Sequence, residues 1–256
     1  MSKITIKQIR EKYLSSKEKE KEFKWTYHVR RPISYYMALP FFRMGTSAST
    51  VTMLWLLIAG IGCVFVASGA YYNMIFGAAL LELAVILDCV DGHIARFTRQ
   101  TRTGDILDTW VGEILLVSSF FSIGIGVANS PDPIVTSMII PFLGDKMFFI
   151  YLGFFGALAT LSSWTVQLHW RTIAMKSTSS GTELNHRTKN SRMSLIVENL
   201  FNYMGGLMML ILISAIFRVL DVTLILMSIV YGGYLIAMMG RVIRKAQTLD
   251  RTDLEK

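Results

Sequence analysis

Asp88-Cys-Val-Asp-Gly-His-Ile-Ala-Arg96 is the sequence at which one long apolar segment ends, and Gly104-Asp-Ile-Leu-Asp108 is the sequence at which the next one begins. Three aspartates therefore stand around one short polar turn. Charged side chains at the edge of a bilayer cost free energy, so a cluster of them indicates function. Carboxylates next to small residues suit divalent cations and a phosphorylated ligand.

The composition is that of a polytopic membrane protein. Of the 256 residues, 52% are hydrophobic and only 17% are charged. Several apolar runs reach the ~20 residues that a helix needs to cross a bilayer, which argues against a large soluble helical protein. The two cysteines, Cys63 and Cys89, both stand in apolar segments. They indicate neither a disulfide framework nor a zinc site.

We expect an all-α integral membrane protein with six transmembrane helices. The predicted spans are 47–69, 72–95, 104–127, 146–169, 194–217 and 221–241. Together they make a six-span domain over 46–243, preceded by 1–45 and followed by a cytoplasmic tail over 244–256.

The amino-terminal part divides into two predicted helices. Residues 1–24 contain many Lys and Glu residues and no apolar stretch, so we expect a solvated charged helix and no signal peptide. Residues 25–45 mix aromatic and basic side chains, which favours an amphipathic helix in the membrane interface.

The basic residues indicate the orientation. Of the 26 Lys and Arg residues, all but Lys146 and Arg218 fall on one side of the predicted membrane. By the positive-inside rule that side is the cytoplasm. We therefore expect both termini and the aspartates to be cytoplasmic, in the plasma or inner membrane if the organism is prokaryotic. The formal charge of +8 then reflects topology and contact with anionic lipids, and no nucleic-acid partner.

Helix geometry groups the motif residues. At ~100° per residue, Asp88 and Asp91 share one face of the second span. A hairpin can bring Asp108, at the start of the third span, to these carboxylates, and a divalent cation would relieve their repulsion. Mg²⁺ or Mn²⁺ prefers such hard oxygen ligands, and Arg96 offers a positive fork for phosphate oxygens. The alternative is that the aspartates only pair with nearby arginines.

The pattern Asp88-x2-Asp91-Gly92-x2-Ala95-Arg96-x7-Gly104-x3-Asp108 resembles the signature of the CDP-alcohol phosphotransferases. The resemblance implies a reaction of phospholipid synthesis, in which a CDP-linked lipid or alcohol donor gives its phosphoryl-alcohol part, of phosphatidyl type, to a polar alcohol acceptor and releases CMP. It implies two Mg²⁺ or Mn²⁺ ions held by Asp88, Asp91 and Asp108. It also implies a nucleotide site lined by Asp88, Asp91, Gly92, Ala95, Arg96 and Gly104.

The sequence departs from the family pattern at Gly112, where a fourth aspartate usually serves as metal ligand and proposed general base. Glu113 follows directly, but on a regular helix position 113 is rotated by about 140° from Asp108. Because the spacing from Arg96 to Gly104 is seven residues where eight is common in the family, a register shift could let Glu113 act as a substitute base. Two interpretations stay open: catalysis by Glu113 with Asp108, or a homologue that binds CDP-ligand and metal without efficient turnover.

Other polar residues are weaker candidates for an acceptor site. Arg187, Lys189 and Arg192 could hold a phosphate of the acceptor, or could simply reflect topology and contact with lipid headgroups. Glu198 and Asn202 lie in the predicted fifth span, where they could line an acceptor pocket or join helices.

Three further features have structural interpretations. We expect Glu82 to form a buried pair, and His93 to face a loop and not a metal, since no second ligand is suitably spaced. The glycine pairs at 205–206 and 232–233 permit close helix packing, including packing within a homodimer.

Overall fold

The computed structural model describes residues 4–16, 23–98, 102–131, 145–177, 199–202 and 205–254. Within these ranges the regular elements are helices and none is a strand, which confirms the all-α class. Five helices in this part of the chain are long and apolar enough to cross a membrane. They are α3 (Ala48–Ala67), α4 (Tyr71–Phe97), α5 (Arg102–Asn129), α7 (Lys146–Ser177) and α10 (Leu220–Leu254).

The region of the predicted fifth span is built differently from the prediction. Instead of one continuous helix over 194–217, a turn at Gly205 and Gly206 precedes α9 (Leu207–Ile216). Adjacent glycines destabilise a helix interior by ~1 kcal/mol each. With 10 residues, α9 is about 15 Å long and does not cross a ~30 Å hydrocarbon core by itself.

At the carboxyl end, α10 continues as helix to Leu254. The predicted boundary between the membrane domain and a separate tail at 244 therefore falls within one helix.

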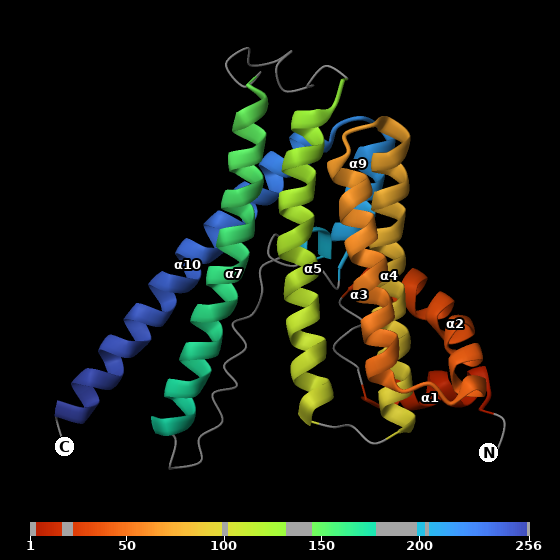
Figure 1. The fold of residues 1–256 in the computed structure, drawn as a ribbon. Coiled ribbons are helices and arrows are strands. Elements are labelled where there is room, and N and C mark those ends of the chain that lie inside the picture. Colours follow the sequence, from red (N-terminus) through yellow and green to blue (C-terminus); the bar gives the residue numbers. More distant parts are fainter. Residues whose placement is uncertain are drawn as a thin grey trace.

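The amino-terminal segment is not the fully solvated helix that we predicted. It contains α1 (Ile6–Ser16), a π-helix η2 (Thr26–Arg30) and α2 (Arg31–Met44). Ile9 and Tyr13 are four residues apart and both are buried, because this one apolar stripe of α1 packs against α2 and α4. Figure 1 shows α1 lying across the end of the bundle.

Close backbone contacts hold the long helices together in pairs. A Cβ on Gly77 of α4 would come within 2.5 Å of the Gly62 carbonyl oxygen of α3, and a Cβ on Gly153 of α7 would come within 3.1 Å of the Gly124 Cα of α5. Small residues at such crossings let helix backbones touch. α3 and α4 consequently lie side by side along their length (Figure 1).

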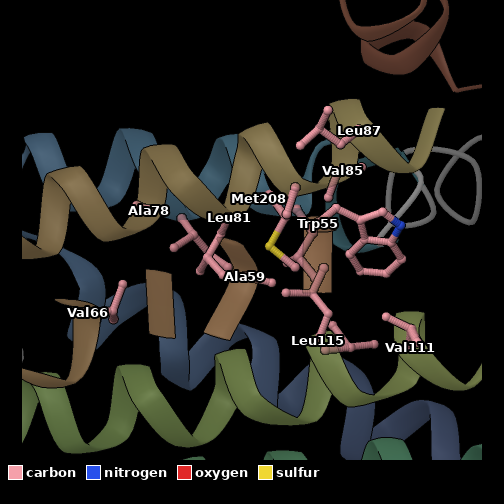
Figure 2. Close-up of a cluster of buried hydrophobic side chains, with 14 of the residues drawn as sticks. Trp55, Ala59, Val66, Ala78, Leu81, Val85, Leu87, Val111, Leu115 and Met208 are labelled. Atoms are coloured by element: carbon pink, nitrogen blue, oxygen red, sulfur yellow. The ribbon is translucent and has the colours of Figure 1, made fainter. Parts of the chain in front are cut away.

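The core beneath the motif is formed where α3, α4 and α5 meet. Trp55 of α3 is fully buried, and Figure 2 shows it beside Val85 of α4 and Val111 and Leu115 of α5. This packing fixes which side of α5 faces α3 and α4.

The motif residues and several helix ends lie at one end of the bundle. α4 ends and α5 begins there, and α1 and the far end of α10 lie at the same end (Figure 1). Asp88 and Asp91 stand in the last turns of α4, so they belong to this end.

Candidate functional site

Asp91 is a buried carboxylate held by two donors from the neighbouring helix. Its Oδ2 accepts hydrogen bonds from Thr52 Oγ1 at 2.7 Å and from Trp55 Nε1 at 2.8 Å. Only 5% of Asp91 is exposed. Donors of this kind fix the direction of a carboxylate, as outer-shell groups do around metal ligands.

Asp88 stands one turn before Asp91 on α4 and is also buried. The two carboxylates share one side of the helix, as the spacing predicts. Hard carboxylate oxygens held by fixed hydrogen bonds are a donor set that suits Mg²⁺ or Mn²⁺. Asp108 lies near the start of α5, and its side chain is outside the described residues. Among the side chains that are described, no three His, Cys, Asp or Glu residues form a metal-binding group.

Arg96 covers the space that Gly92 leaves open. Its Nη1 donates to the Gly92 carbonyl oxygen at 2.9 Å. A Cβ on Gly92 would meet only the guanidinium nitrogens of Arg96, at 3.6 and 3.8 Å. The flexible Arg96 side chain, and no neighbouring helix among the described residues, occupies this space. Ala95 and Gly104 are partly buried at the same end of the bundle.

His93 is buried, and the prediction of a loop-facing side chain is wrong. α4 continues past it to Phe97, and α1 and α2 cover this face of the helix. The Ser34 hydroxyl donates to the Arg31 carbonyl oxygen at 2.8 Å. Ser34 Oγ therefore accepts from His93 Nε2 at 2.9 Å, and His93 Nδ1 faces Arg96 Nη1 at 3.5 Å.

Tyr13 of α1 is a site residue that sequence reasoning missed. Arg31 and Arg96 lie over its ring, at 4.7 and 5.6 Å from the centroid. The Tyr13 and His93 rings meet edge to face, with their centroids 5.9 Å apart. Burial raises the pKa of the neighbouring Tyr35 phenol above its ordinary value, so that group is neutral beside Arg31. The spacing of Ile9 and Tyr13 in an otherwise charged segment was the available signal.

Comparison with known families agrees with these observations. The model of the CDP-alcohol phosphatidyltransferase family matches residues 45–227, which is more than half of the chain. The chain belongs to the CDP-alcohol phosphatidyltransferase family. A search of curated proteins finds no match.

The members of this family share a general chemistry. CDP-alcohol phosphatidyltransferases transfer a phosphate-containing group from a CDP-alcohol and generally depend on divalent metals. The matched residues contain α3, α4 and α5, and with them both buried aspartates. With five membrane-length apolar helices in the described part of the chain, this family member is an integral membrane protein.

Glu82 of this family member forms the buried pair that we predicted. Arg30 donates from Nε to Glu82 Oε1 at 2.8 Å and from Nη2 to Oε2 at 2.7 Å, and Trp25 Nε1 donates to Oε1 at 2.9 Å. Such a bidentate fork is the geometry that arginine makes with a carboxylate. The π-helix η2 carries Arg30 to this contact.

Glu113 lines a cavity that the two aspartates of α4, Asp88 and Asp91, do not line. On α5 it is about 200° from Val111 and from Leu115, which face α3 and α4 (Figure 2). It lines a cavity of about 670 Å³ between α5, α7 and α10. Neither Asp88 nor Asp91 is among its lining residues. Those lining residues are Glu113, Leu116, Thr160, Ser163, Trp164, Gln167, Phe201, Asn202, Ile229, Val230, Tyr231, Gly233, Tyr234 and Ala237.

The remaining acceptor candidates divide between the described and the undescribed parts of the chain. Asn202 lines the same cavity as Glu113, in agreement with its suggested place in a pocket. Arg187, Lys189, Arg192 and Glu198 lie outside the described residues.

Proposed function

We propose that this family member transfers a phosphatidyl-type group from a CDP-linked lipid to the hydroxyl of a polar alcohol and releases CMP, in phospholipid synthesis. The observation that carries the proposal is the pair of buried carboxylates, Asp88 and Asp91, one turn apart in α4 within the matched family region. Ionisable side chains in membrane helices are rare and mark functional sites.

Asp88, Asp91 and Asp108 are the proposed ligands of two Mg²⁺ or Mn²⁺ ions. Such ions, when bound, neutralise the diphosphate and stabilise the leaving CMP. Thr52 and Trp55 hold Asp91 in one orientation through Oδ2.

The nucleotide side of the site is formed by small residues and one arginine. Gly92, Ala95 and Gly104 leave room for the nucleotide, and Arg96 is flexible enough to turn from the Gly92 carbonyl to a phosphate oxygen. Glu113 as the substitute base stays a prediction, as does phosphate binding by Arg187, Lys189 and Arg192.

The proposed topology has six crossings with a cytoplasmic active site. The fifth crossing would combine α9 with the residues that precede Gly205. Two observations support one common side for the termini and the site: α1, the α4–α5 junction and the end of α10 share one end of the bundle (Figure 1), and basic residues are concentrated there. A homodimer stays a prediction.

A second candidate is a family member that binds CDP-ligand and metal without efficient turnover. Gly112 favours it, because the fourth aspartate of the family pattern is replaced by a residue that can neither bind metal nor accept a proton.

The test is a CMP-release assay with the full chain in lipid nanodiscs, CDP-diacylglycerol, Mg²⁺ or Mn²⁺, and a set of polar alcohols. The expected result is metal-dependent CMP release with at least one alcohol, and loss of metal-dependent CDP binding in Asp91→Asn. Metal-dependent binding without turnover for any alcohol would establish the second candidate. Unchanged binding in Asp91→Asn would contradict the site itself.

A further inference from the structure

The cavity between α5, α7 and α10, which we name the α5–α7–α10 chamber, is lined by an acid, Glu113, and by neither of the α4 aspartates. Two glutamates of the membrane helices differ in their surroundings. Glu82 is saturated by the Arg30 fork and by Trp25. Glu113 is half-buried, and within the described residues it makes no hydrogen bond or ion pair. Ionisable groups inside membrane helices are rare, and those that occur usually face a partner or a cavity with a function.

A second polar group of the chamber also lacks a partner. Ser163 of α7 is 5% exposed, and its Oγ is a buried side-chain atom without a hydrogen-bond partner in the described part of the chain. Leaving such a group unsatisfied costs about 1–3 kcal/mol. Ser163 and Glu113 line the same space, so one ligand could satisfy both groups.

Aromatic rings form much of the remaining wall. Tyr231 donates its hydroxyl to the Phe201 carbonyl oxygen at 2.6 Å, and Gln167 Nε2 donates to the Tyr234 hydroxyl at 2.9 Å. Trp164 packs edge to face on Trp110, with ring centroids 6.4 Å apart. Hydrogen bonds and packing thus hold three rings around a space that also contains a carboxylate. Aromatic faces with a negative charge are the recognition chemistry of organic ammonium groups.

We propose that the α5–α7–α10 chamber binds an ammonium compound that also carries a hydroxyl group, with the cationic nitrogen at Glu113 among the aromatic rings and the hydroxyl at Ser163. Its volume of about 670 Å³ is that of a small-molecule site. The assignment of this compound as the acceptor alcohol rests on the proposed function. The binding of an ammonium compound does not depend on that function.

Charge favours an ammonium compound over a neutral polyol. A polyol would satisfy Ser163 through hydrogen bonds but would leave the Glu113 carboxylate without a counter-charge inside a membrane helix bundle. A buried carboxylate is stabilised chiefly by a cation with good geometry. No described basic residue lines the chamber, and Arg241 and Lys245 stand beside Trp170 in the neighbouring cavity.

The test is direct binding of choline and ethanolamine to the full chain in nanodiscs without any CDP donor, with glycerol and inositol as neutral comparisons. We expect both ammonium compounds to bind and the neutral polyols not to compete. Glu113→Gln should raise the Kd for choline at least ~10-fold, which corresponds to 1.4 kcal/mol, and Glu113→Asp should retain part of the affinity. Ser163→Ala should weaken binding less. Thr165→Ala, on the exposed side of the same helix, is the matched control.

Thermal unfolding of Glu113→Gln in nanodiscs, compared with the wild type, shows whether the variant is folded. Nanodiscs with and without ethanolamine-headgroup lipid then separate a lipid source from a soluble one, because a lipid ligand would compete with choline. Binding of polyols as tight as that of choline, wild-type affinity in Glu113→Gln, or no binding of any ammonium compound would overturn the proposal.

The same variant separates this proposal from the proposed reaction. A base at Glu113 predicts a fall in kcat at constant KM in Glu113→Gln, whereas ammonium recognition predicts a rise in the acceptor KM. If neutral alcohols support CMP release and no ammonium compound binds, only the proposal for the chamber is contradicted. If an ammonium compound binds and no CMP is released, only the proposed transfer reaction is contradicted.

Discussion

At the scale of single residues, Asp91 shows how α3 orients a carboxylate of α4. A threonine hydroxyl and an indole N–H reach the same oxygen, Oδ2. The orientation of the Asp91 carboxylate is thus fixed by the protein before any ligand binds. Preorganised groups of this kind are what a metal site requires of its surroundings.

Removing either donor should weaken the proposed metal site. Thr52→Val and Trp55→Phe each take one hydrogen bond from Asp91 while keeping most of the packing volume. We expect metal affinity to fall by ~10–100-fold and stability by about 1–3 kcal/mol. Mn²⁺ titration and thermal unfolding measure the two effects. Thr165→Val, at an exposed position of α7, is the control, and wild-type Mn²⁺ affinity in both site variants would contradict the assigned role of Asp91.

The pair of Arg30 and Glu82 is a second interaction that can be tested at this scale. Arg30→Met would leave the Glu82 carboxylate buried without its cation, which should cost ~3–5 kcal/mol. Because apolar replacement of a whole buried pair is often neutral, Arg30→Met with Glu82→Leu should recover much of that loss. Unfolding of both variants in detergent measures this. A single variant as stable as the wild type would show that the pair is dispensable.

At the scale of elements, α1 connects the amino terminus to the motif. Its Tyr13 lies under two arginines, one of which is the motif residue Arg96. Lys12 of the same helix lies over the Phe97 ring at 4.4 Å. α1 therefore acts as a cover on the end of α4, and the position of the Arg96 guanidinium depends partly on it.

Changes at Tyr13 should affect nucleotide binding through Arg96. Tyr13→Phe keeps the ring face and should bind CDP like the wild type. Tyr13→Leu keeps apolar packing but loses the ring, and each cation–π contact stabilises by ~0.5–2 kcal/mol, so CDP affinity should fall several-fold. Equal affinities of the two variants would show that α1 only packs on α4. Hydrogen exchange of α1 distinguishes a local change from undocking of the whole helix.

At the scale of the whole molecule, the arrangement of helices predicts which segments share one side of the membrane. α1 and the end of α10 lie at the end of the bundle where α4 meets α5 (Figure 1). Asp145 directly precedes α7, and its Oδ1 accepts a hydrogen bond from the Met147 N–H in the first turn. From there α7 runs towards the end of the bundle where α4 meets α5 (Figure 1).

Labelling of introduced cysteines tests this arrangement. Cysteines placed at the exposed positions Lys7 and Thr248 should react with a membrane-impermeant maleimide from the same side of sealed vesicles. A cysteine at Asp145 should react only from the opposite side. The unsubstituted chain is the control, since Cys89 is buried and Cys63 is half-buried within the helices. Reaction of Lys7→Cys and Thr248→Cys from opposite sides would contradict the common end.

Length and apolarity of the segments were enough to predict five of the membrane helices, because a helix that crosses a bilayer must be long and apolar over ~20 residues whatever it packs against. The spacing of Asp88, Asp91 and Arg96 was enough to place them together at one helix end, since that spacing depends only on helix geometry.

Only the tertiary structure decided which groups these residues meet. Trp55, a partner of Asp91, is 36 residues away from it, and Arg30, a partner of Glu82, is 52 residues away. The burial of His93 depends on α1 and α2 docking over α4. Glu113 points to the α5–α7–α10 chamber because Val111 and Leu115 turn the opposite side of α5 to the core. Contacts of this kind arise from packing between distant segments, and a local sequence pattern can show that a helix has a buried side but not which segment packs on it.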